Sequence, residues 1–424
     1  MPADVNVPVS TAARAIRYTP PSQAEVVLGG GVVYAMILAL IFLQKFAAPI
    51  GVKLPISVPL IAVYIGLAAM VMRLQIKVAP TRLAAFALLF TGIFISQMFS
   101  LGGISTLSLL QLLVLYFPLV FIWRVSQEQY LKTLNVFQNA MLVICAVVAI
   151  QLLSQALFGL GVQPSIEDHV PVKFLLPGYN YDAPIKWGAK FVRPNGFFFL
   201  EPSFASSFLA CALITELMFF HRLWRTAVYA AALLGCVAAT GLVLFALALP
   251  FVIRRQSARM ILAGAGLAMV AGLVGFATGT FDGLIARVGE LGSPGSSAWQ
   301  RLVAPVIQLG QVYSDPRYVL TGAGAGSNLE GNSSTWPVVK VMIEYGVLSG
   351  LAFMLLLVNC AINAPNRAVA FAFFVIFNFT GGFLMTPASV IQFWLLIALM
   401  APVLPPRPVS WRPRRRRDVA APAA

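Results

Sequence analysis

Charged residues are scarce in this chain of 424 residues, at 10% of the sequence against 59% hydrophobic residues. Soluble domains carry about 25% charged residues, so the composition excludes a soluble globular enzyme. Apolar runs of roughly 20 residues recur from Val26 to Leu404, and each can cross a bilayer core of about 30 Å as a helix. The sequence therefore predicts an all-α, polytopic integral membrane protein folded as a helical bundle.

Histidine and cysteine are also rare, with two and four copies in the chain. The histidines, His169 and His221, fall in a loop and at a helix end, so a catalytic Ser-His pair with Ser203 is not expected. The cysteines lie in apolar segments without metal-ligand or disulfide spacing, which indicates packing residues. No HExxH, CxxC or DxD-type cluster appears in the outer loops, and we expect neither a metal nor a cofactor.

Acidic residues are few, and the 14 Asp and Glu against 29 Lys and Arg give a net charge of +15. Mapped onto the loops, the basic residues follow the positive-inside rule and place both termini in the cytoplasm. The basic stretch Arg412 to Arg417 suits the anionic inner leaflet, where each basic residue contributes about 1 kcal/mol, and a nucleic-acid partner is not expected. The predicted cytoplasmic residues are Arg14, Arg17, Arg73, Lys77, Arg82, Arg124, Lys132, Arg222, Arg225, Arg254, Arg255, Arg259, Arg367 and those from Arg407 to Arg417.

The same rule decides one ambiguous apolar stretch, 226–253. One helix there would put Arg254 on the face opposite Arg222, whereas two short segments meeting near Thr240 and Gly241 keep both on one side. We therefore predict about 12 segments, two of them short. The remaining candidate spans are 26–46, 55–72, 83–101, 105–123, 134–158, 197–220, 260–279, 338–358, 368–386 and 390–404. The predicted organisation is an N-terminal tail (1–25), a single membrane domain (26–404) with outer loops 159–195 and 280–337, and a basic tail (405–424).

The stretch from Arg193 to Ser203 reads Arg-Pro-Asn-Gly-Phe-Phe-Phe-Leu-Glu-Pro-Ser. We expect Arg193 at the outer mouth of a helix and Glu201 about two turns inside, with Pro202 able to kink it. A carboxylate within the membrane is costly and functional by default, although pairing with a nearby cation for packing is the alternative. The serines that follow, from Ser203 onward, more often permit close helix packing than catalysis.

The second outer loop carries an amphipathic stretch, residues 299–313, in which Pro305 must start or kink a helix. Arg301 would then lie near the lipid headgroups. Two interpretations are open for it: a guanidinium that grips a phosphate through two parallel bonds, or an arginine that merely reaches the interface.

The stretch from Thr321 to Asn328 is rich in glycine but lacks the Lys-Ser or Lys-Thr of a P-loop. It is either a turn that offers backbone N–H groups to an anion or a plain loop. Asn332 follows it, and Trp336, Lys340 and Glu344 enter the next helix. Lys340 and Glu344 are four residues apart and can pair.

Together, these features resemble the Wzy and O-antigen ligase superfamily of integral membrane glycosyltransferases. The matching pieces are Arg193 with the Gly196-to-Ser203 stretch, Arg301, the glycine turn, and Glu344-Tyr-Gly-Val-Leu-Ser-Gly. Ligases of this superfamily usually carry a His-Asn pair where this chain has Gly331-Asn332-Ser333-Ser334, which favours a polymerase. The superfamily's Ser-Arg in the middle hairpin is replaced here by Thr240-Gly241.

The resemblance implies a polymerase that joins repeat units carried on undecaprenyl diphosphate at the periplasmic face of the bacterial inner membrane. Arg193 and Arg301 would neutralise the leaving diphosphate, which assumes that they approach each other, and Glu201, or else Glu344, would act on the attacking hydroxyl. A chain-length regulator is a further expected partner. The expected substrate-binding residues are Asn195, Ser203, Gly324, Asn332, Lys340 and Trp336. Tyr179, Tyr181, Trp187 and Trp336 either stack on sugars or form an interfacial aromatic belt.

Two alternatives remain open from the sequence. An O-antigen ligase or protein glycan transferase of the same superfamily would differ in its acceptor. A lipid-glycan flippase or secondary transporter would also have about twelve segments and an intramembrane carboxylate, but such proteins often show internal repeats. The two halves of this chain have no convincing similarity to each other.

Overall fold

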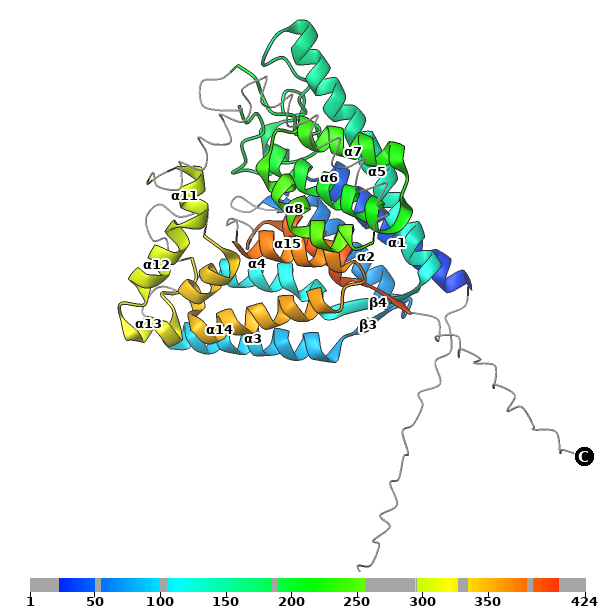
Figure 1. The fold of residues 1–424 in the computed structure, drawn as a ribbon. Coiled ribbons are helices and arrows are strands. Elements are labelled where there is room, and N and C mark those ends of the chain that lie inside the picture. Colours follow the sequence, from blue (N-terminus) through cyan, green and yellow to red (C-terminus); the bar gives the residue numbers. More distant parts are fainter. Residues whose placement is uncertain are drawn as a thin grey trace, which may run out of the picture.

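The computed structural model describes residues 23–49, 55–99, 105–184, 190–255, 294, 296–326, 335–379 and 384–403. The protein is mainly helical (Figure 1). Its first half contains α1 (Gln23–Phe42), α2 (Val58–Met72), α3 (Pro80–Phe99), α4 (Thr106–Tyr116), α5 (Gln127–Phe158), α6 (Pro202–Thr215), α7 (Leu223–Gly235) and α8 (Ala239–Ile253). The second half contains α11 (Ser297–Leu302), α12 (Ala304–Val312), α13 (Pro316–Thr321), α14 (Pro337–Ile362), α15 (Arg367–Phe379) and α16 (Pro387–Phe393).

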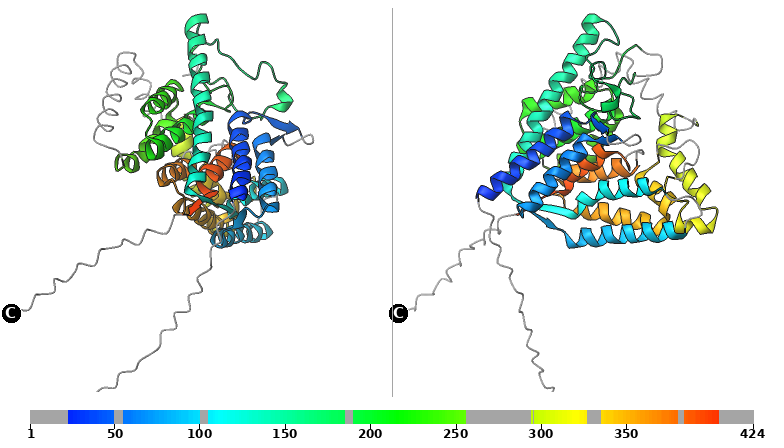
Figure 2. Two further views of the ribbon diagram at one scale, coloured as in Figure 1. Left: turned by 90° about the vertical axis from the view of Figure 1, so that its right-hand side faces the viewer. Right: turned by 180° about the vertical axis from the view of Figure 1, so that it is seen from behind.

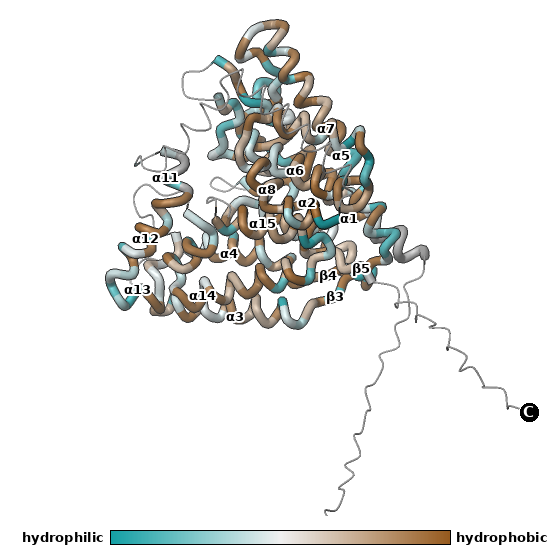
Figure 3. Tube along the Cα trace, in the orientation of Figure 1, coloured by the Kyte–Doolittle hydropathy of each residue, from teal (hydrophilic) through white to brown (hydrophobic). Residues whose placement is uncertain are grey.

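Within the described part of the chain, four helical segments are long and apolar enough to cross a membrane: Pro80–Phe99, Gln127–Phe158, Pro202–Phe220 and Pro337–Ile362. Six shorter apolar helices accompany them. Figure 3 shows apolar residues along most of these helices. The arrangement agrees with a multi-pass membrane protein, and the total of about twelve segments stays a prediction. The predicted span 260–279, most of the predicted N-terminal tail and all of the predicted basic tail lie outside the described residues.

Short β-strands connect several helices and pair with one another, a feature that was not predicted from the sequence. Strands β1 (Ala47–Pro49) and β2 (Pro55–Ser57) form a hairpin between α1 and α2. Strands β3 (Ile76–Val78), β4 (Phe121–Ser126) and β5 (Met400–Val403) form one sheet, antiparallel between β3 and β4 and parallel between β4 and β5. This sheet brings the end of α2 and the starts of α3 and α5 to one end of the bundle, where α1 also begins (Figure 1). Loops carrying predicted cytoplasmic residues therefore meet at the same end.

The ambiguous stretch 226–253 forms two helices, α7 and α8, joined by a turn at 236–238. Near its start, α8 lines a cavity with the C-terminal half of α15, because Thr240 and Phe377 border the same space. Near its end, Phe251 packs against Phe371, with ring centroids 5.4 Å apart. Helix α8 thus runs antiparallel to α15 and returns Arg254 toward the end of the bundle where α15 begins.

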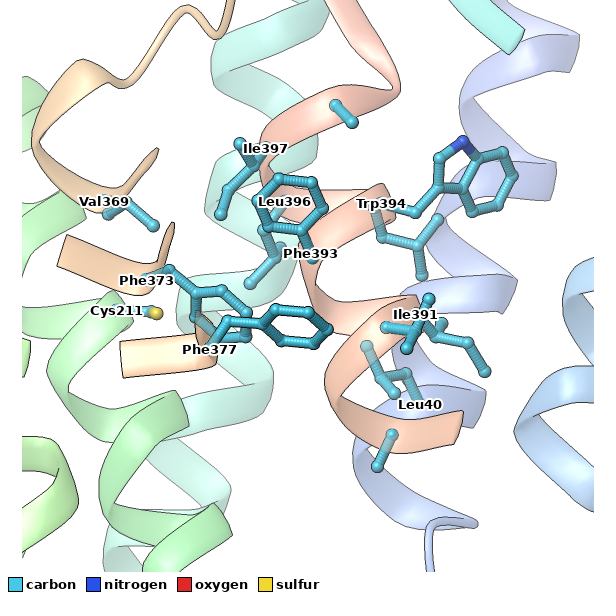
Figure 4. Close-up of a cluster of buried hydrophobic side chains, with 14 of the residues drawn as sticks. Leu40, Cys211, Val369, Phe373, Phe377, Ile391, Phe393, Trp394, Leu396 and Ile397 are labelled. Carbon is cyan, nitrogen blue, oxygen red and sulfur yellow. The ribbon is translucent and has the colours of Figure 1, made fainter. Parts of the chain in front are cut away.

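The core lies around α16, whose residues are all buried. Figure 4 shows Phe393 among Phe373 and Phe377 of α15, with Cys211 of α6 nearby and Leu40 of α1 beside Ile391. Phe373 and Phe393 lie 6.0 Å apart between ring centroids. All four cysteines are buried and free, as expected for packing residues.

Candidate functional site

The segment 193–201 is irregular and is held by two glutamines of α5. The side chain of Gln155 both donates to the carbonyl of Val192 (2.8 Å) and accepts from its N–H (3.0 Å). Gln151 accepts from the N–H of Gly196 at 2.9 Å. Gly196 has φ +66°, in the left-handed region that glycine tolerates best, and a Cβ there would lie 3.0 Å from Ile144. The segment is therefore fixed to α5 rather than being a continuation of α6.

Asn195 is buried, with 2% of its surface exposed, and every polar group of its side chain has a protein partner. Its Oδ1 accepts from Gln151 (3.1 Å) and from the N–H of Phe197 (2.9 Å), and its Nδ2 donates to the carbonyl of Tyr181 (3.0 Å). Arg193, which is half-buried, donates through its backbone N–H (3.0 Å) and its Nε (3.4 Å) to the carbonyl of Ala183. Asn195 therefore joins the loop that follows α5 to the segment that carries Arg193.

Glu201 is the N-cap of α6, with φ −149°, and Pro202 occupies the first helical turn. The prediction that Glu201 lies about two turns inside a helix was therefore wrong. Proline starts a helix there instead of kinking one, because its missing N–H is tolerated in the first turn. The half-buried carboxylate accepts from the N–H of Asn180 (3.4 Å) and from Ser203 Oγ (3.2 Å). The positive end of the α6 dipole favours a negative charge at this position.

A small cavity of about 10 Å³, with room for roughly one water molecule, lies beside Ser203. Its lining mixes polar and aromatic side chains: Ser203, Phe204, Ser207, Thr240, Phe373, Ile376, Phe377, Ser389 and Gln392. Above it, Tyr179 packs edge-on against Phe204, with centroids 6.0 Å apart. Burial raises the pKa of Tyr179, and the nearby charge of Glu201 raises it further, so its hydroxyl remains a donor at neutral pH.

The second group of predicted residues surrounds a break in α14. Gly346 has φ 82° and ψ 170° inside this helix, which frees carbonyl groups of the preceding turn. The glycine-rich turn satisfies them, because Ala323 donates its N–H to Ile343 (2.7 Å) and Gly324 donates to Glu344 (3.1 Å). The next N–H, that of Ala325, donates to Gln97 Oε1 at 3.4 Å. These amides bind α14 and α3 and so have protein partners, and the plain-loop interpretation therefore fits better than an anion-binding turn.

Glu344 is buried, with 5% of its surface exposed. Its carboxylate lies 3.9 Å from Lys340 Nζ, which is the predicted i,i+4 pair, and it accepts a hydrogen bond from the backbone of Gly326. One turn before Lys340, Trp336 packs edge-on against Phe379 with ring centroids 5.3 Å apart. The N-terminal part of α14 thus presents a cation, a carboxylate and an indole beside the end of α15.

Helix α15 links the two groups. Phe377 borders the cavity beneath Ser203, and Phe379, two residues further, contacts Trp336. Helix α15 also lies between α8 and α14, packing against both (Figure 1). Both groups therefore face the same end of α15, the end that points away from the β3-β4-β5 sheet.

Three predicted residues cannot be compared fully with the structure. The backbone of Arg301 belongs to α11, and Pro305 starts α12 as one of the two expected alternatives, but the Arg301 side chain lies outside the described part. Asn332 and Trp187 also lie outside it. The approach of Arg193 to Arg301 stays a prediction.

The sequence analysis missed Lys45, which follows α1 and has a fully buried side chain. Its Nζ lies 2.5 Å from Glu167 Oε1 and 5.1 Å from the ring centroid of Tyr181. Its partner is 122 residues away, so no spacing in the sequence pointed to this pair. Among the described residues, no group of three or more His, Cys, Asp and Glu side chains could hold a metal ion.

Comparison with known families gives one match. A family described as WcaD colanic acid polymerase matches residues 26–323, well over half of the chain. The match includes Arg193, Glu201 and Arg301 and ends within the glycine turn, before Glu344. No curated protein and no solved structure matches the chain. The chain belongs to the WcaD colanic acid polymerase family, which consists of Wzy-type polymerases of polysaccharide repeat units.

Proposed function

We propose that this protein joins oligosaccharide units carried on undecaprenyl diphosphate into an exopolysaccharide, capsule or O-antigen at the periplasmic face of the bacterial inner membrane. The family supports polymerisation of repeat units. The observation that carries the assignment of the site is the fixed segment 193–201, which presents Arg193 and Glu201 and lies within the family match.

In the proposed reaction, a sugar hydroxyl of one lipid-linked unit attacks the anomeric carbon of another. The new glycosidic C–O bond forms as the C–O bond to the diphosphate breaks, and undecaprenyl diphosphate leaves with the electron pair. Negative charge grows on the leaving group, so cations fixed beside it lower the barrier by several kcal/mol. Arg193 and Arg301 take this role in the proposal, and it needs no metal ion.

The hydroxyl proton passes to a carboxylate, for which Glu201 is the first candidate. It is half-buried, and its described partners are one N–H and one hydroxyl, which leaves room for a substrate donor. Glu344 is the second candidate, because it is more deeply buried and its carboxylate already interacts with Lys340 and with the backbone of Gly326. A general base needs hydrogen-bond reach to the proton that it accepts, which favours the more accessible group.

The remaining predicted residues have supporting roles in the proposal. Asn195 and Gly324 hold their segments through hydrogen bonds, and Ser203 orients the carboxylate of Glu201. Lys340 and Trp336 offer a cation and a sugar-stacking surface at the outer end of α14. Asn332 completes the set, and a chain-length regulator remains an expected partner.

The test is the length distribution of the cell-surface polysaccharide in a deletion strain complemented with wild type, Arg193→Ala or Glu201→Gln. We expect both variants to leave single repeat units in place of long chains. The rate of polymerisation should fall by about 100-fold or more, as when an enzyme loses one hydrogen-bond donor to the transition state. Arg317→Ala is the matched control, since Arg317 is exposed and pairs with Asp315. Membrane levels are measured in parallel.

Other outcomes separate the alternatives. Normal chain length with unattached polymer in the deletion strain would make the protein a ligase. Lipid-linked units trapped on the cytoplasmic side would make it a transporter. Full-length polymer from both site variants would remove Arg193 and Glu201 from the site while leaving the family assignment intact.

A further inference from the structure

Lys45 lies just after α1, and both its Nζ and its carbonyl contact the loop that follows α5. Its Nζ contacts Glu167, whose other carboxylate oxygen accepts from Ser165 Oγ. Its carbonyl accepts from the N–H of Leu176 at 2.8 Å. Beside it, Phe46 and Leu175 form a β-bridge. Figure 2 shows the loop after α5 descending to this end of α1 and the β1-β2 hairpin.

Lys45 reaches the site segment through one intermediate residue. The ammonium lies over the ring of Tyr181, a cation-π contact that is strongest when both groups are desolvated. The hydroxyl of Tyr181 donates to the carbonyl of Leu176, and its own carbonyl accepts from Asn195 Nδ2 (3.0 Å). Tyr181 is thereby held at both ends, by Lys45 on its ring and by Asn195 on its backbone.

The neighbours of Lys45 hold the same segment from a second side. The side chain of Gln44 accepts from the N–H of Leu200 at 3.2 Å, one residue before Glu201. Phe42 packs edge-on against Phe198, with centroids 5.0 Å apart. The end of α1 therefore contacts the segment at its middle and its end, and reaches its start through Tyr181.

A buried ion pair is a poor way to gain stability alone. Replacing such a pair with well-packed apolar residues is often neutral or stabilising, because desolvation offsets much of the attraction. A fixed pair does define geometry, since each charge must meet its partner at hydrogen-bond distance. The Lys45–Glu167 pair joins elements that are distant in sequence, which suits a geometric role.

We propose that Lys45 is a positioning residue of the polymerase, which clamps the outer loop through Glu167 and Tyr181 so that Asn195 keeps the segment 193–201 in its working geometry. The inference rests on the proposed function, because it assumes that this segment serves the reaction. It assigns no contact between Lys45 and substrate.

The test uses the full-length protein in nanodiscs with a lipid-linked repeat unit as substrate. Two readouts are compared: kcat and KM for chain extension, and the rate of trypsin cleavage after Lys173, which is exposed in the clamped loop. For Lys45→Met we expect cleavage about tenfold faster, from local opening of the loop, and kcat about tenfold lower with KM changed less than threefold. Glu167→Gln should shift both readouts in the same direction as Lys45→Met. It replaces Lys45→Met as the test variant if that protein does not fold.

Two further variants separate positioning from stability. Glu216→Gln breaks an ion pair in which the carboxylate is fully buried and Arg222 is partly exposed, at the end of α6 away from the site, and it should leave cleavage after Lys173 and kcat unchanged. The double variant Lys45→Met/Glu167→Leu removes the unpaired buried charge. It should recover the thermal stability of wild type but not its kcat.

The outcomes are distinct. Faster cleavage with normal kcat, or unchanged cleavage and kcat in both single variants, overturns the role of Lys45. A double variant with full kcat also overturns it, because stability alone would then explain the pair. If Glu201→Gln and Arg193→Ala retain full activity in the same assay, the proposed site fails instead, whatever Lys45 does.

Discussion

Gly346 and Leu320 are in such close contact that a Cβ on Gly346 would lie 2.0 Å from the carbonyl oxygen of Leu320. The contact marks the place where the end of α13 fits into the break in α14. The same junction carries the hydrogen bonds from the glycine turn to Ile343 and Glu344. The position of Glu344 therefore depends on Gly346, where any side chain would clash with α13.

Gly346→Ala should be strongly destabilising. Its φ of 82° is a left-handed conformation, which costs a non-glycine residue about 1 to 2 kcal/mol before the backbone clash is counted. We expect lower membrane yield and a lower midpoint of thermal unfolding in detergent. Gly310→Ala is the control, because nothing lies within 4 Å of its added Cβ and alanine favours a helix. Equal midpoints for Gly346→Ala and wild type would contradict the steric argument.

Part of this junction was readable from the sequence. The i,i+4 spacing predicted the Lys340–Glu344 pair, and the apolar runs predicted the helices around it, because both signals are local. The break at Gly346 was not predicted, since an isolated glycine in an apolar run is usually tolerated within a helix. What decides it is the docking of the turn 322–326, a contact between segments that the helix pattern does not encode.

Gln151→Leu tests the anchor of the site segment. The variant removes the acceptor of the Gly196 N–H and the donor to Asn195, leaving buried polar groups unpaired at about 1 to 3 kcal/mol each. We expect loss of long polysaccharide chains together with a lower unfolding midpoint. Gln138→Leu is the matched control on the same helix: it loses a buried hydrogen bond to Ala212, away from the segment, and should reduce stability while chains stay long. Equal chain lengths in the two variants would sink the anchoring role.

The wrong prediction for Glu201 has the same origin. Pro202 is compatible with a kink inside a helix and with the first turn of a new one, and the sequence around it does not distinguish them. Gln151 and Gln155 on α5 decide between these two conformations. They accept hydrogen bonds from the N–H groups of Gly196 and Val192, which a longer α6 would use within the helix. The Lys45–Glu167 pair was missed for a related reason, since a lysine at the end of an apolar run resembles an ordinary interfacial residue.

The Glu167 carboxylate predicts a specific dependence of stability on pH. Burial alone would raise its pKa, but hydrogen bonds from Lys45 and Ser165 outweigh that effect and hold it below the ordinary value. A depressed carboxyl pKa contributes stability above the unfolded-state pKa of about 4.5, and that contribution is lost as pH falls through the folded-state value. The unfolding midpoint of wild type should therefore exceed that of Glu167→Gln at neutral pH, and the difference should shrink progressively below about pH 4.5.

Glu128→Gln provides the comparison for this pH series. Glu128 forms an exposed i,i+4 pair with Lys132, and exposed pairs contribute little because water and salt screen them. Its midpoint should follow that of wild type at every pH. A difference between wild type and Glu167→Gln that is independent of pH would mean that packing, not ionisation, explains the effect of the variant.

The orientation in the membrane can be tested by labelling single introduced cysteines, because the native cysteines are buried. All four are buried, so a thiol reagent should not label the native protein, and a single introduced cysteine reports its own side. Lys173→Cys lies in the loop predicted to face the periplasm, and Lys77→Cys lies on β3 at the opposite end, both at exposed positions. In spheroplasts, a membrane-impermeant maleimide should label Lys173→Cys at once and Lys77→Cys only after permeabilisation. The reverse order would turn the bundle over and place Arg193 and Glu201 on the cytoplasmic side, where the proposed reaction could not meet its exported substrate.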